Sequence, residues 1–283
     1  MSAVATIAAY ALRESLRRRV FLVVLLLTAG FLALYAVGAS AAFDETGGFG
    51  STAGVDPQIL TGSTLLGLAM FATLFLGTVL AVFLTLGAVR GDAERGLLQP
   101  LVVRPLGRAQ LLLGRFVGAA SVCALYVTLL YAASVAITGA VGGWWPDRVV
   151  SPGAGLVAGI VIIAAASLLG SVYLSPVANG IAVFMVFGAG LVAGLLGQIG
   201  ESIGSDTLRQ IGNTAAWFVP FEALYQSGLH GLTEDTGLFT EFAVSLGPFG
   251  GAQHTSGWLW PWSLAYLGLV AVAAVAGFRR RDL

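Results

Sequence analysis

The sequence predicts an all-α, polytopic membrane protein, and three observations support this fold class. The chain of 283 residues is 57 % hydrophobic and only 10 % charged, which is more apolar surface than a soluble domain of this length could cover. Its charged residues gather in a few short stretches. Between them lie uncharged runs of about 20 residues or more, enough to cross ~30 Å of hydrocarbon as a helix. We predict six transmembrane helices in a single domain, residues 1–283.

Residues 1–19 predict an amphipathic helix on the membrane surface. Apolar residues recur at helical spacing from Ile7 to Val20, and four arginines lie in the second half: Arg13, Arg17, Arg18 and Arg19. The alternative is a simple basic flank to the first span, which we expect at Phe21–Ala42. A cleaved signal peptide is the other reading of this run, but its apolar core would be unusually long. Residues 44–57 are polar and glycine-rich, and we expect a loop.

The second and third spans flank a charged loop. Residues 59–89 are uncharged and long enough for a tilted helix. Residues 90–116 hold five of the basic residues, and residues 117–141 form the third apolar run. That run ends in Gly142-Gly143-Trp144-Trp145-Pro146, an aromatic belt followed by a turn.

Residues 149–200 carry no charge, and one helix of that length would not fit a bilayer. Ser175-Pro176 lies near the middle, where proline breaks helical hydrogen bonding. We therefore expect two spans, about 153–174 and 177–198, joined as a tight hairpin. Each contains a GxxxG pair, which allows close backbone approach: Gly155 with Gly159, and Gly190 with Gly194.

Residues 199–257 differ from the rest because they are mixed and acidic. Pro220 is suited to the first position of a short helix, with one apolar face made of Phe221, Leu224, Tyr225 and Leu229. A second amphipathic piece contains Leu238, Phe242 and Leu246. We expect short helices on or dipping into the outer membrane surface, followed by the sixth span at 258–278.

The arginines predict the orientation. With six spans and both termini in the cytoplasm, twelve arginines are cytoplasmic and only Arg148 and Arg209 are outside. All six tryptophans then fall on the outer side. A five-span arrangement would move Arg279, Arg280 and Arg281 to the outside and is rejected. The expected location is the prokaryotic plasma membrane, with lipid around the spans.

The sequence offers no catalytic set of its own. It contains no lysine, so it lacks the phosphate-binding GxxxxGK[ST] motif, and any ATP hydrolysis must occur in another polypeptide. No predicted span contains Asp, Glu or Arg, which argues against a proton relay. His230 and His254 lie near acidic residues but without metal-ligand spacing. We expect no cofactor and no metal in this chain, and its zero net charge indicates no nucleic-acid partner.

The charged loop contains the most specific pattern in the chain. It runs Glu94-Arg95-Gly96-Leu97-Leu98, then Arg104-Pro105, and it ends at Gly114-Arg115. This pattern resembles the loop between spans two and three in permease subunits of ABC-2 type ATP-binding-cassette transporters. The six spans, the N-terminal ALRESLRRRVFLVVLLL and the short helix before the last span are also similar to that family. Leu97 and Arg115 replace the usual Thr and Lys, and Pro100 interrupts the expected short helix.

The resemblance implies a coupling helix at about residues 92–99 that binds the ATPase subunit. The residues that would bind the ATPase are Arg90, Asp92, Glu94, Arg95, Gly96, Leu97, Leu98, Arg104, Pro105 and Arg108. Arginine and carboxylate side chains offer charge-assisted contacts, and the leucines offer an apolar one. The alternative is a solvated loop whose arginines only set topology.

The resemblance also implies a function and its partners. The chain would be the permease subunit of an exporter, paired with a second copy or a paralogue. Two ATPase subunits carrying ATP and Mg would bind below. An alternative within the same class is a transducer that relays ATPase motion to an extracytoplasmic protein through residues 201–257. An intramembrane enzyme is the third reading, and it lacks a catalytic set.

Overall fold

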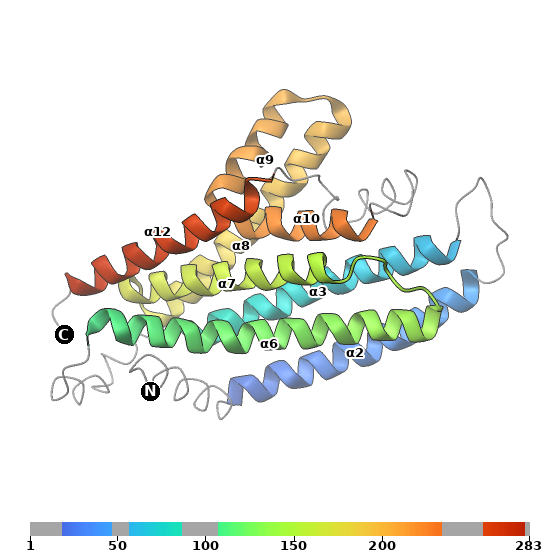
Figure 1. Ribbon diagram of the computed structural model, residues 1–283, viewed down its shortest axis with the longest axis horizontal. Coiled ribbons are helices and arrows are strands. Elements are labelled where there is room, and N and C mark those ends of the chain that lie inside the picture. The colour runs from blue at the N-terminus through green and yellow to red at the C-terminus, as the bar shows by residue number, and fades with distance from the viewer. Residues whose placement is uncertain (1–18, 47–56, 87–106, 234–256, 281–283) are drawn as a thin grey trace.

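The computed structural model describes residues 19–46, 57–86, 107–233 and 257–280, and these parts form eight helices without strands (Figure 1). Six helices are long and apolar enough to cross a membrane. They are α2 (Arg19–Thr46), α3 (Pro57–Thr85), α6 (Arg108–Gly142), α7 (Val150–Tyr173), α8 (Pro176–Ile203) and α12 (Leu259–Arg279). Two shorter helices lie between α8 and α12: α9 (Asp206–Phe218) and α10 (Pro220–Thr233). The prediction of a six-span, all-α membrane protein is therefore confirmed.

Several span boundaries differ from the prediction, and one of them is the end of α8, which continues past residue 198 and through Glu201 to Ile203. Helix α2 continues through Asp44 and Glu45 to Thr46, so the expected loop begins later. Helix α6 begins at Arg108, nine residues before the predicted Val117. The last part of the predicted charged loop is therefore the first turns of the third span, and Arg115 lies inside a helix. The next proline after Pro105 is Pro146, which lies beyond the end of α6. At the start of the helix, the backbone N–H of Gly107 donates to the side chain of Gln110.

The bundle has two distinguishable ends. At one, which we call the arginine end, α6 begins at Arg108 and α12 ends at Arg279 (Figure 1). At the other, the tryptophan end, α6 runs into Trp144 and Trp145. Helix α12 is shorter, and its start at Leu259 lies near the middle of the length of the bundle (Figure 1). Helices α3 and α7 are buried over most of their length and contribute much of the core.

Helix α2 lies on the outside of the bundle, and few of its residues are buried. Two buried hydrogen bonds hold it to α6. The hydroxyls of Thr28 and Tyr126 are 2.6 Å apart, and so are those of Tyr35 and Thr138. In hydrocarbon these bonds replace lost water contacts, so they fix the position of α2 along α6.

The Tyr35–Thr138 bond gives a testable stability difference. A double-mutant cycle with Tyr35→Phe and Thr138→Val should give a coupling energy of about 0.6 kcal/mol, the mean for hydrogen bonds between membrane helices. The measurement is the free energy of unfolding of the purified protein in micelles. A cycle of Ser40→Ala with Thr138→Val is the control, because the hydroxyl of Ser40 bonds only the carbonyl of Val37 in its own helix. Equal coupling in both cycles would contradict the assignment.

The break predicted at Ser175-Pro176 is present. Helix α7 ends at Tyr173, Leu174 and Ser175 form the connection, and Pro176 is the first residue of α8. The two glycine pairs do allow close approach, but to α10 rather than to each other. A Cβ on Gly155 would lie 2.7 Å from the backbone oxygen of Leu224. A Cβ on Gly190 would lie 2.8 Å from the ring of Phe221.

Helix α10 therefore packs along α7, and its first turn also lies against α8. Its first turn contacts Gly159 near the middle of α7, and Gly228 near its other end contacts Pro152 in the first turn of α7. The helix thus starts at mid-length of the bundle and runs toward the tryptophan end. The predicted face of Phe221, Leu224, Tyr225 and Leu229 is confirmed as buried, and neighbouring α10 residues are buried as well.

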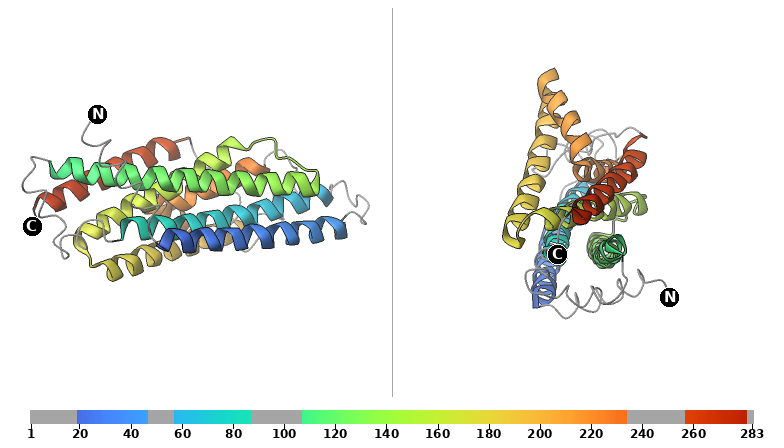
Figure 2. Two further views of the ribbon diagram at one scale, coloured as in Figure 1. Left: turned by 90° about the horizontal axis from the view of Figure 1, so that it is seen from below. Right: turned by 90° about the vertical axis from the view of Figure 1, so that its left-hand side faces the viewer.

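Helices α8 and α9 form a hairpin that leaves the bundle toward one side (Figures 1 and 2). Gly204 makes the turn in the left-handed region, with φ of 71°. Glycines keep the two backbones close, since a Cβ on Gly212 would lie 2.7 Å from the Cα of Gly197. Two predictions lie outside the described residues. They are the surface helix of residues 1–19, except for Arg19, and the piece with Leu238, Phe242 and Leu246.

Candidate functional site

Most of the predicted ATPase-binding residues lie outside the described parts of the chain. These are Arg90, Asp92, Glu94, Arg95, Gly96, Leu97, Leu98, Arg104 and Pro105. Arg108 is the first residue of α6. The segment that carries the motif joins the end of α3 to the start of α6, and both of these helix ends face the arginine end (Figure 1).

A buried polar cluster ties the end of α3 to α7 and α8. The hydroxyl of Thr85, the last residue of α3, donates to the Ser167 hydroxyl at 2.7 Å. The side-chain amide of Asn179 in α8 donates to the backbone oxygen of Ser167 at 2.9 Å. All three residues are fully buried. The cluster therefore links the end of α3 to both helices, because polar partners in an apolar core are costly to separate.

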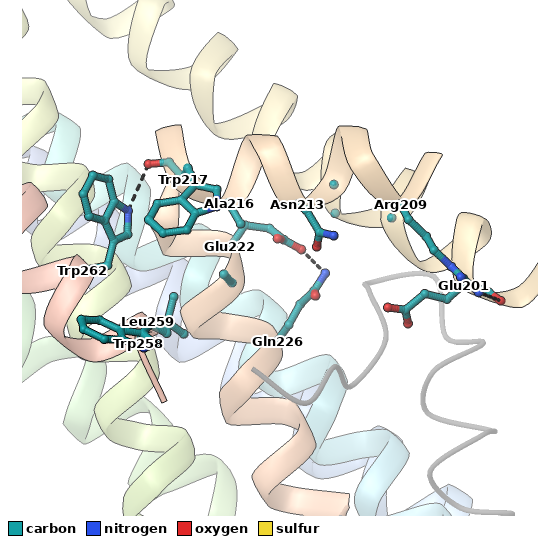
Figure 3. A pocket seen from close by; sticks show the side chains of 14 residues that line it. Glu201, Arg209, Asn213, Ala216, Trp217, Glu222, Gln226, Trp258, Leu259 and Trp262 are labelled. Carbon is teal, nitrogen blue, oxygen red and sulfur yellow. Dashed lines mark hydrogen bonds between the residues drawn. The ribbon is translucent and has the colours of Figure 1, made fainter. Parts of the chain in front are cut away.

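A second candidate site is a cavity of about 420 Å³ between α8, α9, α10 and the start of α12 (Figure 3). Three glycines, Gly194, Gly197 and Gly212, form part of its wall, and the other side chains that line it are mostly polar or aromatic. The volume lies within the range usual for small-molecule sites in proteins.

Glu222 forms the floor of this cavity. It lies in the first turn of α10 and is only 8 % exposed. The Gln226 amide, one turn later, donates to its carboxylate. The carboxylate lies directly against Gly194 of α8, where any Cβ would overlap it. Burial raises the pKa of Glu222 to about 8, and the hydrogen bond from Gln226 lowers it in part.

Indole rings form one wall of the cavity. Trp217 of α9 and Trp262 of α12 meet edge to face, with ring centroids 5.0 Å apart. The Trp262 indole N–H donates to the backbone oxygen of Trp217 at 3.1 Å. Trp258 lines the same side of the cavity (Figure 3). The contact fixes the start of α12 against the end of α9.

Arg209 lies on the opposite side of the cavity from the indoles, and its guanidinium points away from Glu222 (Figure 3). It forms an ion pair with Asp206 at 3.8 Å and donates to the backbone oxygen of Glu201 at 3.3 Å. The arrangement can hold a ligand that meets a carboxylate at the floor and aromatic faces at one wall.

Sequence reasoning did not identify Glu222 as a site residue. The residue lies outside the six predicted spans, in the acidic segment 199–257. The usable signal was Glu222 and Gln226 one turn apart within an apolar helix pattern. Within the described residues, no group of three or more His, Cys, Asp or Glu could hold a metal ion.

Two comparisons relate the chain to known proteins. A family model described as ABC-2 family transporter protein matches residues 5–283, nearly the whole chain. A curated protein from Stutzerimonas stutzeri, described as "Probable ABC transporter permease protein NosY", is 43 % identical over 67 residues. That match covers 24 % of this chain and 24 % of the relative, so the chain matches about a quarter of the relative's length.

Proposed function

Because the chain belongs to the ABC-2 transporter protein family, we propose that it is the permease subunit of an ABC exporter. The family makes it a multi-pass membrane subunit that works with an ABC ATPase. In our proposal that ATPase is a separate polypeptide with its own ATP and Mg, and it binds at the arginine end. The observation that carries this is the family match over residues 5–283.

The proposed orientation follows the arginines. With the arginine end in the cytoplasm, both termini are cytoplasmic and the tryptophan end faces outward in a prokaryotic plasma membrane. The expected coupling segment, residues 92–99, then lies on the same side as the ATPase. Two ATPase subunits and a second permease copy or a paralogue complete the proposed complex.

The proposed coupling uses the end of α3. Closure of the ATPases would push on residues 90–108, which join α3 to α6, two long helices. The contacts of Thr85 with Ser167, and of Ser167 with Asn179, would pass that movement to α7 and α8. Such a rigid-body shift would open a path outward between the two permease subunits.

The motif residues provide the test. Glu94→Ala and Arg104→Ala should each weaken binding of the cognate ATPase by at least about tenfold, the effect of losing ~1.4 kcal/mol from a central interface contact. The measurement is binding of purified ATPase to the permease in nanodiscs, together with ATP hydrolysis. Glu45→Ala, at the tryptophan end, is the matched control and should leave both unchanged. Unchanged binding in both motif variants would refute the proposed interface.

The transducer function has one observation in its favour. The α8–α9 hairpin leaves the bundle, and α9 has no buried residue in its own length, so it offers surface to another protein. ATP hydrolysis that responds to a transported compound in liposomes, without any further protein, supports the exporter. Hydrolysis that responds only to an extracytoplasmic protein, and fails to do so when the α9 surface is changed, supports the transducer.

A further inference from the structure

We propose that the cavity between α8, α9, α10 and α12 binds an ammonium group of an organic cation, with Glu222 as the counter-charge and Trp217 and Trp262 as the aromatic wall. This site is separate from the proposed ATPase interface. It lies on the part of α10 that packs against both α7 and α8, and its test needs no ATPase.

The charge balance of the cavity favours a cation. Glu222 receives its hydrogen bond from the neutral amide of Gln226, which leaves the negative charge of the ionised form in place. Arg209, the cationic side chain in the lining, is directed to Asp206 and to the backbone of Glu201. Arg209 is the one cation among the described residues that line the cavity. A carboxyl group buried there is costly to ionise, and a bound ammonium group lowers that cost.

The aromatic wall supplies the second half of the recognition. An ammonium group over an indole face is attracted by the ring quadrupole, and the attraction is moderate at a partly exposed ring such as Trp217, which is 56 % exposed. Trp217 and Trp262 hold each other in place through their ring contact and the bond from the Trp262 N–H to the Trp217 oxygen. The wall is therefore fixed before a ligand arrives, which reduces the ordering cost of binding.

The ligand can come from two sources that share this chemistry. One is a free amine or quaternary ammonium compound, and the other is the ammonium headgroup of a membrane lipid. The cavity volume of about 420 Å³ accepts either head group. Glu222 lies beside Gly194 of the membrane-spanning helix α8, so both water-borne and lipid-borne ligands are tested.

The first measurement compares a cation with its neutral isostere. The probes are choline and 3,3-dimethylbutan-1-ol, titrated into the full-length protein in phosphatidylglycerol nanodiscs, with tryptophan fluorescence as the signal. The titration is done at alkaline pH, which favours the ionised form of Glu222. Choline should bind at least about tenfold more tightly than the isostere, a difference of ~1.4 kcal/mol. Equal affinities would overturn the proposal without any variant being needed.

Variants then assign the residues. Glu222→Gln keeps the size and the hydrogen bond to Gln226, and should weaken choline binding at least about tenfold. Glu201→Gln, the same change at the exposed rim, should alter it less than about twofold. Trp262→Leu should also weaken binding of choline more than of the isostere. A folded Glu222→Gln protein, checked by gel filtration and circular dichroism, that binds choline normally would refute the role of Glu222.

The lipid source is tested by changing the nanodisc. Both discs are measured at about 0.5 M salt, which screens the negative surface potential of phosphatidylglycerol. If a lipid headgroup occupies the site, phosphatidylcholine discs should suppress the choline titration seen in phosphatidylglycerol discs. If the ligand is a free amine, the titration should be the same in both. Each result supports an ammonium site and identifies its source. Failure of the proposed ATPase interface would leave the choline titrations in both kinds of disc unchanged.

Discussion

Replacing Phe221 by alanine is expected to lower the free energy of unfolding by about 3–5 kcal/mol, the usual range for truncating a buried phenylalanine. The side chain is only 1 % exposed. Its ring stacks on Phe187 of α8 with centroids 5.3 Å apart, and its backbone oxygen lies close to Gly159 of α7. Phe221 therefore fills the point at which α7, α8 and α10 meet. It also lines an apolar cavity of about 150 Å³ between α7 and α8, which the truncation would enlarge.

The matched control is Phe218→Ala, the same change three residues earlier at the end of α9. Phe218 is 70 % exposed, so its loss leaves no cavity in the protein. Both variants are compared with the parent chain by reversible unfolding in mixed micelles, followed by circular dichroism. Similar losses for the two variants would show that Phe221 does not hold the three helices together.

Gly155→Val is expected to lower the free energy of unfolding by about 1–3 kcal/mol through overpacking. The new Cβ would lie 2.7 Å from the backbone oxygen of Leu224. A backbone atom cannot rotate away as a side chain can, so α10 must move away from α7. The same displacement would disturb the cavity floor, because Glu222 lies on the α10 turn next to Leu224.

Gly188→Val serves as the control for this change. Gly188 is a helical glycine of α8 with nothing within 4 Å of its Cβ position. The substitution there carries the same change in helix propensity without a clash. Thermal unfolding and choline binding are measured for both variants. If Gly155→Val matches Gly188→Val in both measurements, α10 does not depend on contact with Gly155.

The six spans were predictable because each is specified by its own composition. A membrane helix satisfies its backbone internally and needs only an apolar surface toward lipid. The hydrophobic runs at Phe21–Ala42 and at residues 117–141 therefore locate α2 and α6 without any tertiary information. Their boundaries were less predictable. Arg108 and Arg115 read as loop residues because charge normally ends a span, yet helix hydrogen bonding continues past the bilayer surface.

The position of α10 could not be predicted from its sequence. The apolar face of Phe221 and Leu224 predicts a helix with one buried side, as at a membrane surface. Helix α10 packs inside the bundle rather than at its surface because Gly155 and Gly159 of α7 and Gly190 of α8 have no side chains. A GxxxG pattern indicates that a backbone can approach, but the partner helix is decided by the whole fold. Glu222 was missed for the same reason, since its burial depends on α8.

The position of α10 against α7 and α8 also sets an order of events during synthesis. The spanning helices can enter the bilayer individually, because each is sufficiently apolar. Helix α10 has 14 residues and includes Glu222, Gln226 and His230, so it is too short and too polar to do so. It can enter only where α7 and α8 already provide a surface for it to pack against, and both helices precede it in the chain. During co-translational insertion, α7 and α8 therefore enter the membrane first and α10 packs against them afterwards. Helix α12 is inserted after α10.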